Sequence, residues 1–420
     1  MKRIIYIPYL TAFFLLTFIS FGIGGIDAME QPPADEVRLT ADDPVANAEF
    51  GRSVAIDGNL VAVGAGGAAA GSVENAGTVY LFKRQGLTYV PEAKLVAPDA
   101  TNGAEFGRAV AIQGNMVIVG ARFAQVEGFS QAGAAYVFRK YGGSWHLEEK
   151  ITSPTPADED NFGRALAVHG DLLVITARKE AINEEDVGAA YVYYYRDGKW
   201  MNEAKLTASD ASAGAYFGQS VTARGDLIAI GARNADPKGA GAVYLFRQSG
   251  DVWGQVAKLT PPGGNKNDHF GFTVAMVGDV IAVGARRADP DGLTDAGAAY
   301  VFSLEGDSFE LIVRLTASDT SAGDEFGQSI ALAGDVIAVG AWKDDIEGKA
   351  NQGSIYLFHR MGNLWLETEK LTAPDGLAGD EFGYSLSAFG NDMVTGAHFA
   401  DFNAGVDSNE GASYVIPLKP

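Results

Sequence analysis

Apolar and polar positions along this chain follow one pattern that returns seven times. In the stretch DEFGQSIALAGDVIAVGAW, residues 324–342, a Phe-Gly pair precedes a run of small and apolar residues, which is the expected strand A (SIALA at 329–333). A Gly-Asp turn and an apolar run ending in Gly-Ala follow. The turn between the two runs predicts a β-hairpin. Because the second run, VIAVGA at 336–341, has almost no polar position, we expect that strand to be buried on both faces.

Two further strands follow in each unit. A Gly-x-x-Tyr segment leads into an apolar run, SIYLF at 354–358, and the next run, LWLETEKL at 364–371, alternates apolar residues with Lys and Glu. Charged side chains protect the open edge of a sheet from pairing with other chains. We therefore predict a four-stranded antiparallel sheet in each unit, with strands A to D in chain order and strand D outermost.

The spacing of the landmarks predicts how these sheets are assembled. Four-stranded units of about 50 residues are typical of β-propellers, so we predict an all-β, seven-bladed β-propeller, with a linear β-solenoid as the alternative. Phe-Gly begins at seven positions with nearly even spacing: Phe50, Phe106, Phe162, Phe217, Phe270, Phe326 and Phe382.

The ends of the repeat region predict how the ring closes. The last unit stops at Leu418-Lys419-Pro420 without a strand D, whereas the pair Arg38-Leu39 precedes the first Phe-Gly. Every other strand D ends in the same way, with a basic residue followed by Leu or Ile. We predict that residues 34–40 complete blade seven of a propeller formed by residues 29–420.

Residues 1–28 have a different character. Lys2 and Arg3 precede an apolar run from Ile4 to about Gly25, as in a secretory signal peptide. The run also has the roughly 20 residues that an uncleaved membrane anchor needs. We expect residues 1–28 to be a signal peptide or N-terminal anchor, the protein to be secreted, periplasmic or at the cell surface, and membrane contact only if cleavage does not occur.

Only one connection within the units varies in length. The step from the Gly-Ala landmark (Thr-Ala in unit three) to the Tyr of strand C is shortest in unit four and longest in unit seven. The step from Phe to that landmark, by contrast, is the same in all seven units. In a propeller, the B–C and D–A connections emerge on one face. Variable, exposed loops commonly carry function, so this loop face is the predicted binding surface.

Charge and composition narrow the function. The net charge of −21 disfavours nucleic-acid binding, and the absence of Cys excludes disulfides and thiol nucleophiles. No Gly-x-Ser-x-Gly or His-Glu-x-x-His motif is present. The first hypothesis is an exported, non-enzymatic propeller that binds a protein or a glycan. The alternatives are a carbohydrate-active enzyme, a glycosidase or lyase acting at the channel mouth, and an envelope scaffold; the oligomeric state is left open.

Phe-Gly followed by Gly-Ala at this spacing resembles the FG-GAP repeat family, best known from integrin α-subunit propellers. The resemblance covers about residues 34–420 and implies a secreted or surface propeller used in adhesion or ligand binding. Many members of the family carry an Asp-rich calcium loop between strands A and B. Here that link is a short turn such as Gly278-Asp279, which cannot supply the six to eight oxygens that calcium prefers, so no cofactor is expected.

Several residues are candidates for a site. Those that follow Gly-Ala or Thr-Ala form a predicted ring at the channel mouth for an anionic sugar or carboxylate: Arg122, Arg178, Arg233, Arg286, Trp342 and His398. The competing interpretation is that these arginines pair with acids beside Phe-Gly, namely Glu49, Glu105, Glu325 and Glu381. Asp289, Asp291 and Asp295 have some calcium-loop character, but an acidic solvated loop is the favoured interpretation. A recurrent Asp between strands D and A is interpreted as a turn residue: Asp43, Asp99, Asp210, Asp319 and Asp375.

Overall fold

The structure of the protein is a computed structural model that describes residues 36–182, 185–235, 238–305, 308–362, 364–401 and 408–418. The described residues belong to one compact unit, Asp35–Pro420. The expected signal peptide or anchor at residues 1–28 lies outside the described residues. Within the described ranges, no helix combines the length and the apolar character needed to cross a membrane.

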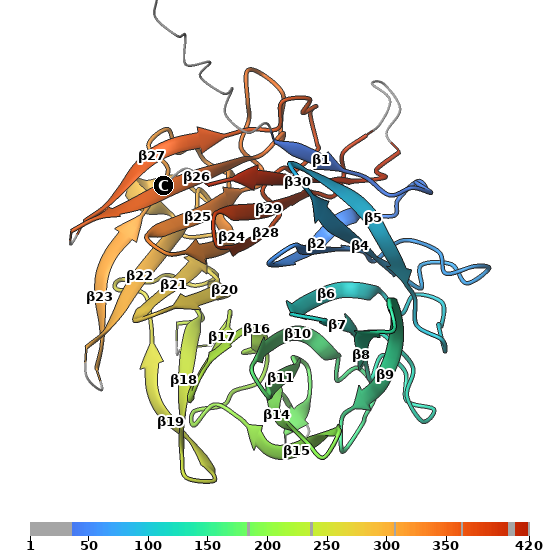
Figure 1. The fold of residues 1–420 in the computed structure, drawn as a ribbon. Coiled ribbons are helices and arrows are strands. Elements are labelled where there is room, and N and C mark those ends of the chain that lie inside the picture. Colours follow the sequence, from blue (N-terminus) through green and yellow to red (C-terminus); the bar gives the residue numbers. More distant parts are fainter. Residues whose placement is uncertain are drawn as a thin grey trace, which may run out of the picture. The chain divides into compact units, whose positions relative to one another are not determined.

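Asp35–Pro420 fold into seven four-stranded antiparallel sheets arranged as the blades of a ring (Figure 1). Blades 1 and 2 are β2 (Phe50–Asp57), β3 (Leu60–Ala65), β4 (Thr78–Gln85), β5 (Thr88–Leu95), and β6 (Phe106–Gln113), β7 (Met116–Ala121), β8 (Ala134–Tyr141), β9 (Ser144–Thr152). Blades 3 and 4 are β10 (Phe162–His169), β11 (Leu172–Ala177), β14 (Ala189–Arg196), β15 (Lys199–Leu206), and β16 (Phe217–Arg224), β17 (Leu227–Ala232), β18 (Ala242–Ser249), β19 (Val252–Leu259). Blades 5 and 6 are β20 (Phe270–Val277), β21 (Val280–Ala285), β22 (Ala298–Glu305), β23 (Ser308–Leu315), and β24 (Phe326–Ala333), β25 (Val336–Ala341), β26 (Ser354–Met361), β27 (Leu364–Leu371). The predicted seven-bladed propeller is confirmed.

Blade 7 is built from both ends of the ring. Its strands are β28 (Ser385–Phe389), β29 (Asp392–Ala397), β30 (Ala412–Pro417) and, at the outer edge, β1 (Val37–Leu39). β1 pairs antiparallel with β30, and Arg38 lies opposite Tyr414. The backbone N–H of Phe50 also donates to the carbonyl of Glu410, at 3.0 Å. The N-terminal strand therefore completes the last blade, as the sequence predicted.

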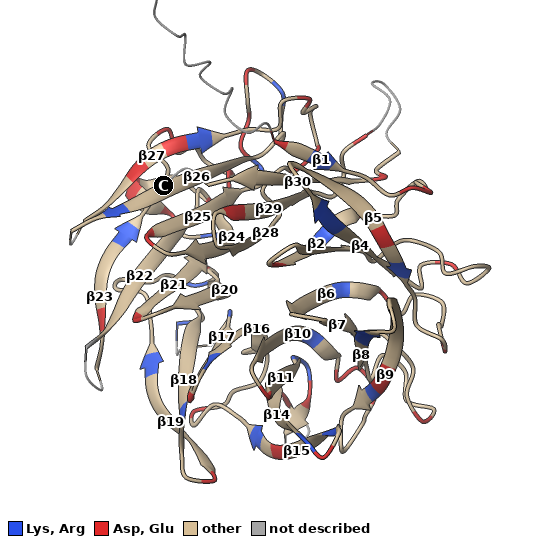
Figure 2. Cartoon of the chain, viewed as in Figure 1, with Lys and Arg blue, Asp and Glu red and all other residues tan. Residues whose placement is uncertain are grey.

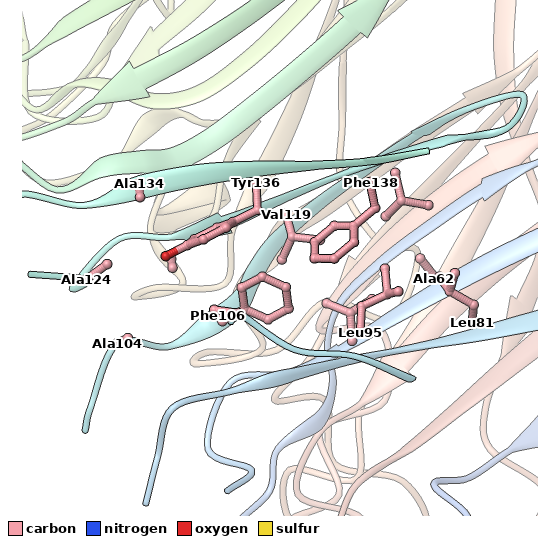
Figure 3. Close-up of a cluster of buried hydrophobic side chains, with 14 of the residues drawn as sticks. Ala62, Leu81, Leu95, Ala104, Phe106, Val119, Ala124, Ala134, Tyr136 and Phe138 are labelled. Atoms are coloured by element: carbon pink, nitrogen blue, oxygen red, sulfur yellow. The ribbon is translucent and has the colours of Figure 1, made fainter. Parts of the chain in front are cut away.

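The apolar pattern of strand B is explained by its place in the blade. All seven strands B are buried along their whole length. Seven hydrophobic clusters fill the spaces between neighbouring blades. In the cluster of blades 1 and 2, the ring of Phe106 lies edge-on to those of Tyr136 and Phe138, with Leu81 and Leu95 facing it from blade 1 (Figure 3). Burial of such rings is the main stabilising contribution.

Neighbouring blades approach so closely that their innermost contacts are backbone to backbone. A Cβ added at Gly64 would lie 2.0 Å from the carbonyl oxygen of Gly107 in the next blade. Ser53 donates its hydroxyl to that same carbonyl, at 2.7 Å. In blade 3 the landmark is Thr176, and its hydroxyl donates to the Gly218 carbonyl at 2.8 Å, so this one Thr replaces the usual Gly and Ser.

Two small elements lie within the B–C loops. β12 (Ala181–Ile182) and β13 (Glu185–Asp186) form a short hairpin in blade 3. The 3₁₀-helix η1 (Pro290–Gly292) lies in blade 5.

Candidate ligand site at the channel mouth

The two faces of the propeller carry connections of different length. Every A–B link is a two-residue turn such as Gly58-Asn59, whereas the B–C loops are several times longer, for example residues 66–77 in blade 1. Strand A begins, and strand B ends, on the face where the B–C and D–A loops emerge. The longer connections therefore lie on this loop face, in agreement with the spacing of the sequence.

The centre of the ring contains a cavity of about 270 Å³ that opens at the loop face. It is lined by strand A of all seven blades. The position directly after Phe-Gly contributes the large side chains, which are Arg52, Arg108, Arg164, Gln219, Phe272, Gln328 and Tyr384. Figure 2 shows the resulting basic bands on β2, β6 and β10, so the cationic part of this lining belongs to blades 1 to 3.

The residue before Phe-Gly has an unusual backbone conformation in every blade. All seven have φ between 51° and 60°, the left-handed region that non-glycine residues rarely adopt. The fold thus imposes one backbone geometry at seven places around the mouth, while the side chains differ: Glu49, Glu105, Asn161, Tyr216, His269, Glu325 and Glu381. Strain that recurs at equivalent positions motivates a functional hypothesis for the side chains it presents.

Two of the predicted ring arginines pair with acids, as the competing interpretation required. Arg122 Nε lies 2.8 Å from Glu105 Oε2. Arg286 Nη1 lies 3.1 Å from Glu325 Oε2 and donates to Gln328 Oε1 at 2.9 Å. Glu325 also accepts from Lys343 at 2.9 Å, so its charge is shared among several cations. For Arg122 and Arg286, acid pairing is confirmed.

Trp342 and His398 occupy the matching positions in blades 6 and 7. The indole N–H of Trp342 donates to Glu325, at 3.1 Å, and its ring lies edge-on to Tyr384. His398 is fully buried, with Nε2 at 2.6 Å from Arg52 Nη1 and at 3.4 Å from Glu381 Oε2, so its ring has no exposed surface. Burial, and then the charge of Arg52, lower the pKa of His398 well below its usual value. His398 is therefore a neutral packing residue.

Arg178 and Arg233 do not follow the acid-pairing interpretation, which is wrong for these two residues. Their guanidinium groups lie 5.1 Å and 4.8 Å from the centre of the same ring, Tyr216. Arg178 donates to Gln219 at 3.3 Å, and neither residue has an ion pair among the described residues. The acid is missing because blades 3 to 5 carry Asn161, Tyr216 and His269 where the other four blades carry Glu.

Arg164 lines the cavity and, like Arg178 and Arg233, has no acidic partner among the described residues. Sequence reasoning did not identify it as a candidate. It has no hydrogen bond or ion pair within the described ranges, and its Nε–H is buried without a partner. Burial, and then the charges of Arg178 and Arg122, lower the pKa of Arg164 well below its usual value. The sequence held the signal, since Arg follows Phe-Gly in units one to three whereas Glu precedes it only in the first two of these.

The pKa shifts agree with a locally positive mouth. Burial, and then repulsion by Arg122 and Arg233, lower the pKa of Arg178 to about 10. Burial lowers the pKa of His269 to about 3, so this residue is neutral at physiological pH. On the opposite side, burial raises the pKa of Glu381 to about 8, which reduces the negative charge available there.

The acidic candidates lie elsewhere. Asp289 accepts the backbone N–H of Asp295 at 2.8 Å, and Asp291 projects outward beside Arg314, at 3.8 Å. Among the described residues, no group of three or more His, Asp or Glu is arranged to hold a metal ion. The expectation about calcium stays a prediction.

The recurrent Asp of the D–A loop has a second role that sequence reasoning missed. Asp319 accepts the phenol of Tyr356 at 2.7 Å and the ammonium of Lys370 at 2.6 Å. Asp375 makes the same contacts with Tyr414 and Arg38 across the ring closure, at 2.8 Å and 2.6 Å. This Asp therefore fastens the D–A loop to strands C and D of the following blade.

Comparisons with known proteins place this architecture in a family. The profile described as "FG-GAP repeat" matches residues 34–82, 89–138, 145–193, 200–246, 253–302, 309–358 and 365–416. A comparison with curated proteins finds no match. Among solved structures, the chain is similar to the Saccharomyces cerevisiae protein Sqt1, with a TM-score of 0.50 and 10% identity over 91% of this chain and 98% of the other; this likeness concerns the fold alone. With seven matched repeats that span the propeller, the chain belongs to the FG-GAP repeat family.

Proposed function

We propose that this protein is an exported, non-enzymatic propeller that binds a protein or glycan ligand through its loop face. The observation that carries the proposal is the contrast between the two faces. One face carries only tight A–B and C–D turns, whereas the other carries the longer B–C loops around a central cavity lined by the first residues of the strands A. A rigid ring that presents variable loops is a common arrangement for recognition.

The exposed apolar side chains offer a matched pair of faces to compare. Phe129, in the B–C loop of blade 2, is 39% exposed, and Val45, in the D–A loop before blade 1, is 47% exposed. On the opposite face, Leu87 in a C–D turn is 73% exposed and Val252 is 69% exposed. Because the pair on the opposite face is the more exposed, a loss of binding confined to the loop-face pair would report the face and not the removal of exposed apolar surface.

The test is a binding screen of the purified mature protein against glycans and envelope fractions, repeated with two double variants. V45S/F129S is expected to weaken binding at least about tenfold, since apolar anchors dominate binding energy. L87S/V252S, the matched control, is expected to bind like the unmodified protein. Chelation of calcium is expected to change neither binding nor melting temperature. Binding lost only in the control variant would contradict the proposal.

A further inference from the structure

The charges around the channel mouth are divided unevenly between the blades. In blades 1, 2, 6 and 7 the residue before Phe-Gly is Glu, and in blades 1, 2 and 6 neighbouring Arg or Lys side chains contact it, as Arg122 contacts Glu105. In blades 3 and 4 that position holds Asn161 and Tyr216; Arg178 and Arg233 lie against the Tyr216 ring, and Arg164 has no acidic partner among the described residues. The Nε–H groups of these three arginines are buried and have no hydrogen-bond partner among the described residues.

An uncompensated cluster of arginines is unfavourable for stability on its own. Removing charges from water costs several kcal/mol unless an opposite charge replaces the lost hydration. Structural arginines elsewhere in this ring have such a partner, so the repeat is able to supply one. We infer that Arg164, Arg178 and Arg233 form a binding site for an anion, with Tyr216 held between two of the guanidinium groups.

The remaining lining indicates which kind of ligand carries that anion. Arg164 lines the central cavity together with Phe272 and Tyr384, which contribute aromatic surface. The Tyr384 ring lies 4.6 Å from the guanidinium of Arg52, and the Phe272 ring lies 4.1 Å from that of Arg286. Its volume of about 270 Å³ is just below the usual range of roughly 300–1,000 Å³ for small-molecule sites. One sugar ring fits this space better than a chain of sugars. An arginine fork binds a carboxylate through two hydrogen bonds, while the aromatic wall accommodates an apolar ring face.

The overall charge argues for a single anionic group rather than a polyanion. With a net charge of −21, the protein repels long anionic polymers, and the positive charge is confined to one sector of the mouth. The ligand class is therefore a sugar acid that inserts one carboxylate at the end of a glycan. This inference rests on the proposed binding function and specifies its ligand.

The experiment titrates the mature protein by calorimetry with D-glucuronate, with D-glucose as the same ring lacking the carboxylate, and with sulfate as the charge without the ring. We expect glucuronate to bind at least about tenfold more tightly than glucose or sulfate. R164Q and R178Q are expected to weaken glucuronate binding at least about tenfold. R139Q is the control: Arg139 lies in β8, is paired with Glu148 at 2.9 Å and does not line the cavity, so this variant is expected to change binding less than about threefold.

Thermal denaturation separates a ligand site from a structural one. R164Q removes an unpaired buried charge, so its melting temperature is expected to equal or exceed that of the unmodified protein. A lower melting temperature for R164Q together with unchanged glucuronate binding assigns Arg164 to the architecture and overturns the inference. Equal affinity for glucuronate and glucose overturns it as well. Either result leaves the comparison of V45S/F129S with L87S/V252S intact, so the wider proposal is judged separately.

Discussion

At two positions of each unit, the close approach of the inner strands limits which residue types the fold accommodates. The glycine of Gly-Ala lies against the backbone of the next blade in every unit except the third, where Thr176 takes its place. The glycine of Phe-Gly has φ between 83° and 95° in all seven units, which an L-residue with a side chain rarely adopts. Glycine recurs at these two positions because a Cβ at the first would meet the backbone of the next blade and the second requires a left-handed φ; Thr176 is the one exception at the first position.

Gly340→Ala tests this packing directly. A Cβ at Gly340 would lie 2.1 Å from the carbonyl oxygen of Gly383. Because that oxygen belongs to the backbone of the next blade, the two strands must separate to admit the Cβ. We expect the free energy of unfolding in urea to fall by about 3 kcal/mol.

Gly254→Ala is the matched control for this change. This glycine lies in β19, does not have a left-handed φ, and has no atom within 4 Å of the added Cβ. Its free energy of unfolding is expected to change by less than about 1 kcal/mol. Similar losses in both variants would contradict the role assigned to the inner glycines.

At the scale of elements, two Asp residues of one D–A loop have pKa values shifted in opposite directions. Asp324, two residues before Phe-Gly, accepts the backbone N–H of Ser321 at 2.7 Å, and burial raises its pKa to about 6. Asp319, in the same loop, is the residue that contacts Lys370 and Tyr356. Burial acts to raise the pKa of Asp319, but hydrogen bonds from Lys370 and Tyr356 outweigh it and lower that pKa.

Asp324→Asn is expected to stabilise the protein in a pH-dependent way. The folded state holds the proton of Asp324 more tightly than the unfolded state does, so the free energy of unfolding falls as pH rises from about 4 to about 6. Asn carries no charge at any pH. The variant is therefore expected to be more stable by about 1–2 kcal/mol at pH 7.5 and unchanged at pH 4.

Asp319→Asn is the control with the opposite sign. Its lowered pKa contributes stability above the usual pKa of Asp, and this contribution is lost as pH falls through the lowered value. The variant is expected to be less stable at pH 7.5, with the difference shrinking in acid. Urea unfolding at both pH values measures each effect, and a pH-independent difference for Asp324→Asn would count against the assigned pKa.

The whole propeller depends on one short strand that closes the ring. β1 contains only three residues, yet it supplies Leu39 to the cluster between blades 7 and 1 and Arg38 to the contact with Asp375. Leu39 is 3% exposed and packs with Phe50 and Val415. Without β1, strand β30 becomes an open edge with unpaired backbone groups.

Deleting residues 29–40 is therefore expected to lower the melting temperature markedly, by about 10 °C or more, as measured by circular dichroism. The converse change is V37C/V415C, which links two residues that lie opposite each other in the β1–β30 pair. Because the natural chain has no Cys, only the designed disulfide forms. Closing so long a loop is expected to add about 4 kcal/mol when oxidised. A deletion variant that melts like the full protein would refute this account of ring closure.

Much of the fold was predictable because the same pattern of apolar runs and turns recurs in all seven units. The predicted strand B at residues 336–341 coincides with β25, and the predicted strand D at residues 364–371 coincides with β27. The predicted strand A at residues 329–333 is longer in the structure, since β24 begins at Phe326. Its first residues pair across a bulge, and alternation alone does not reveal a bulge.

The candidate site was predictable only in part. The sequence identified Arg122, Arg178, Arg233 and Arg286 as one repeat position, and it proposed acids for all of them. Pairing depends on distances between side chains of neighbouring blades, which the strand pattern leaves undefined. Arg286, for example, contacts Glu325 and Gln328 from blade 6, whereas Arg178 contacts Tyr216 and Gln219 from blade 4.

By itself, the sequence determined the number of blades, their strands, the strand that closes the ring and the face with long loops. Each of these features follows from the local periodicity of apolar residues and from the spacing of the landmarks, and both recur from unit to unit. Only the tertiary structure decided which arginines are neutralised and which are left without an acid. That outcome depends on residues from successive units that meet around a shared axis, where one Tyr in place of a Glu changes the local charge.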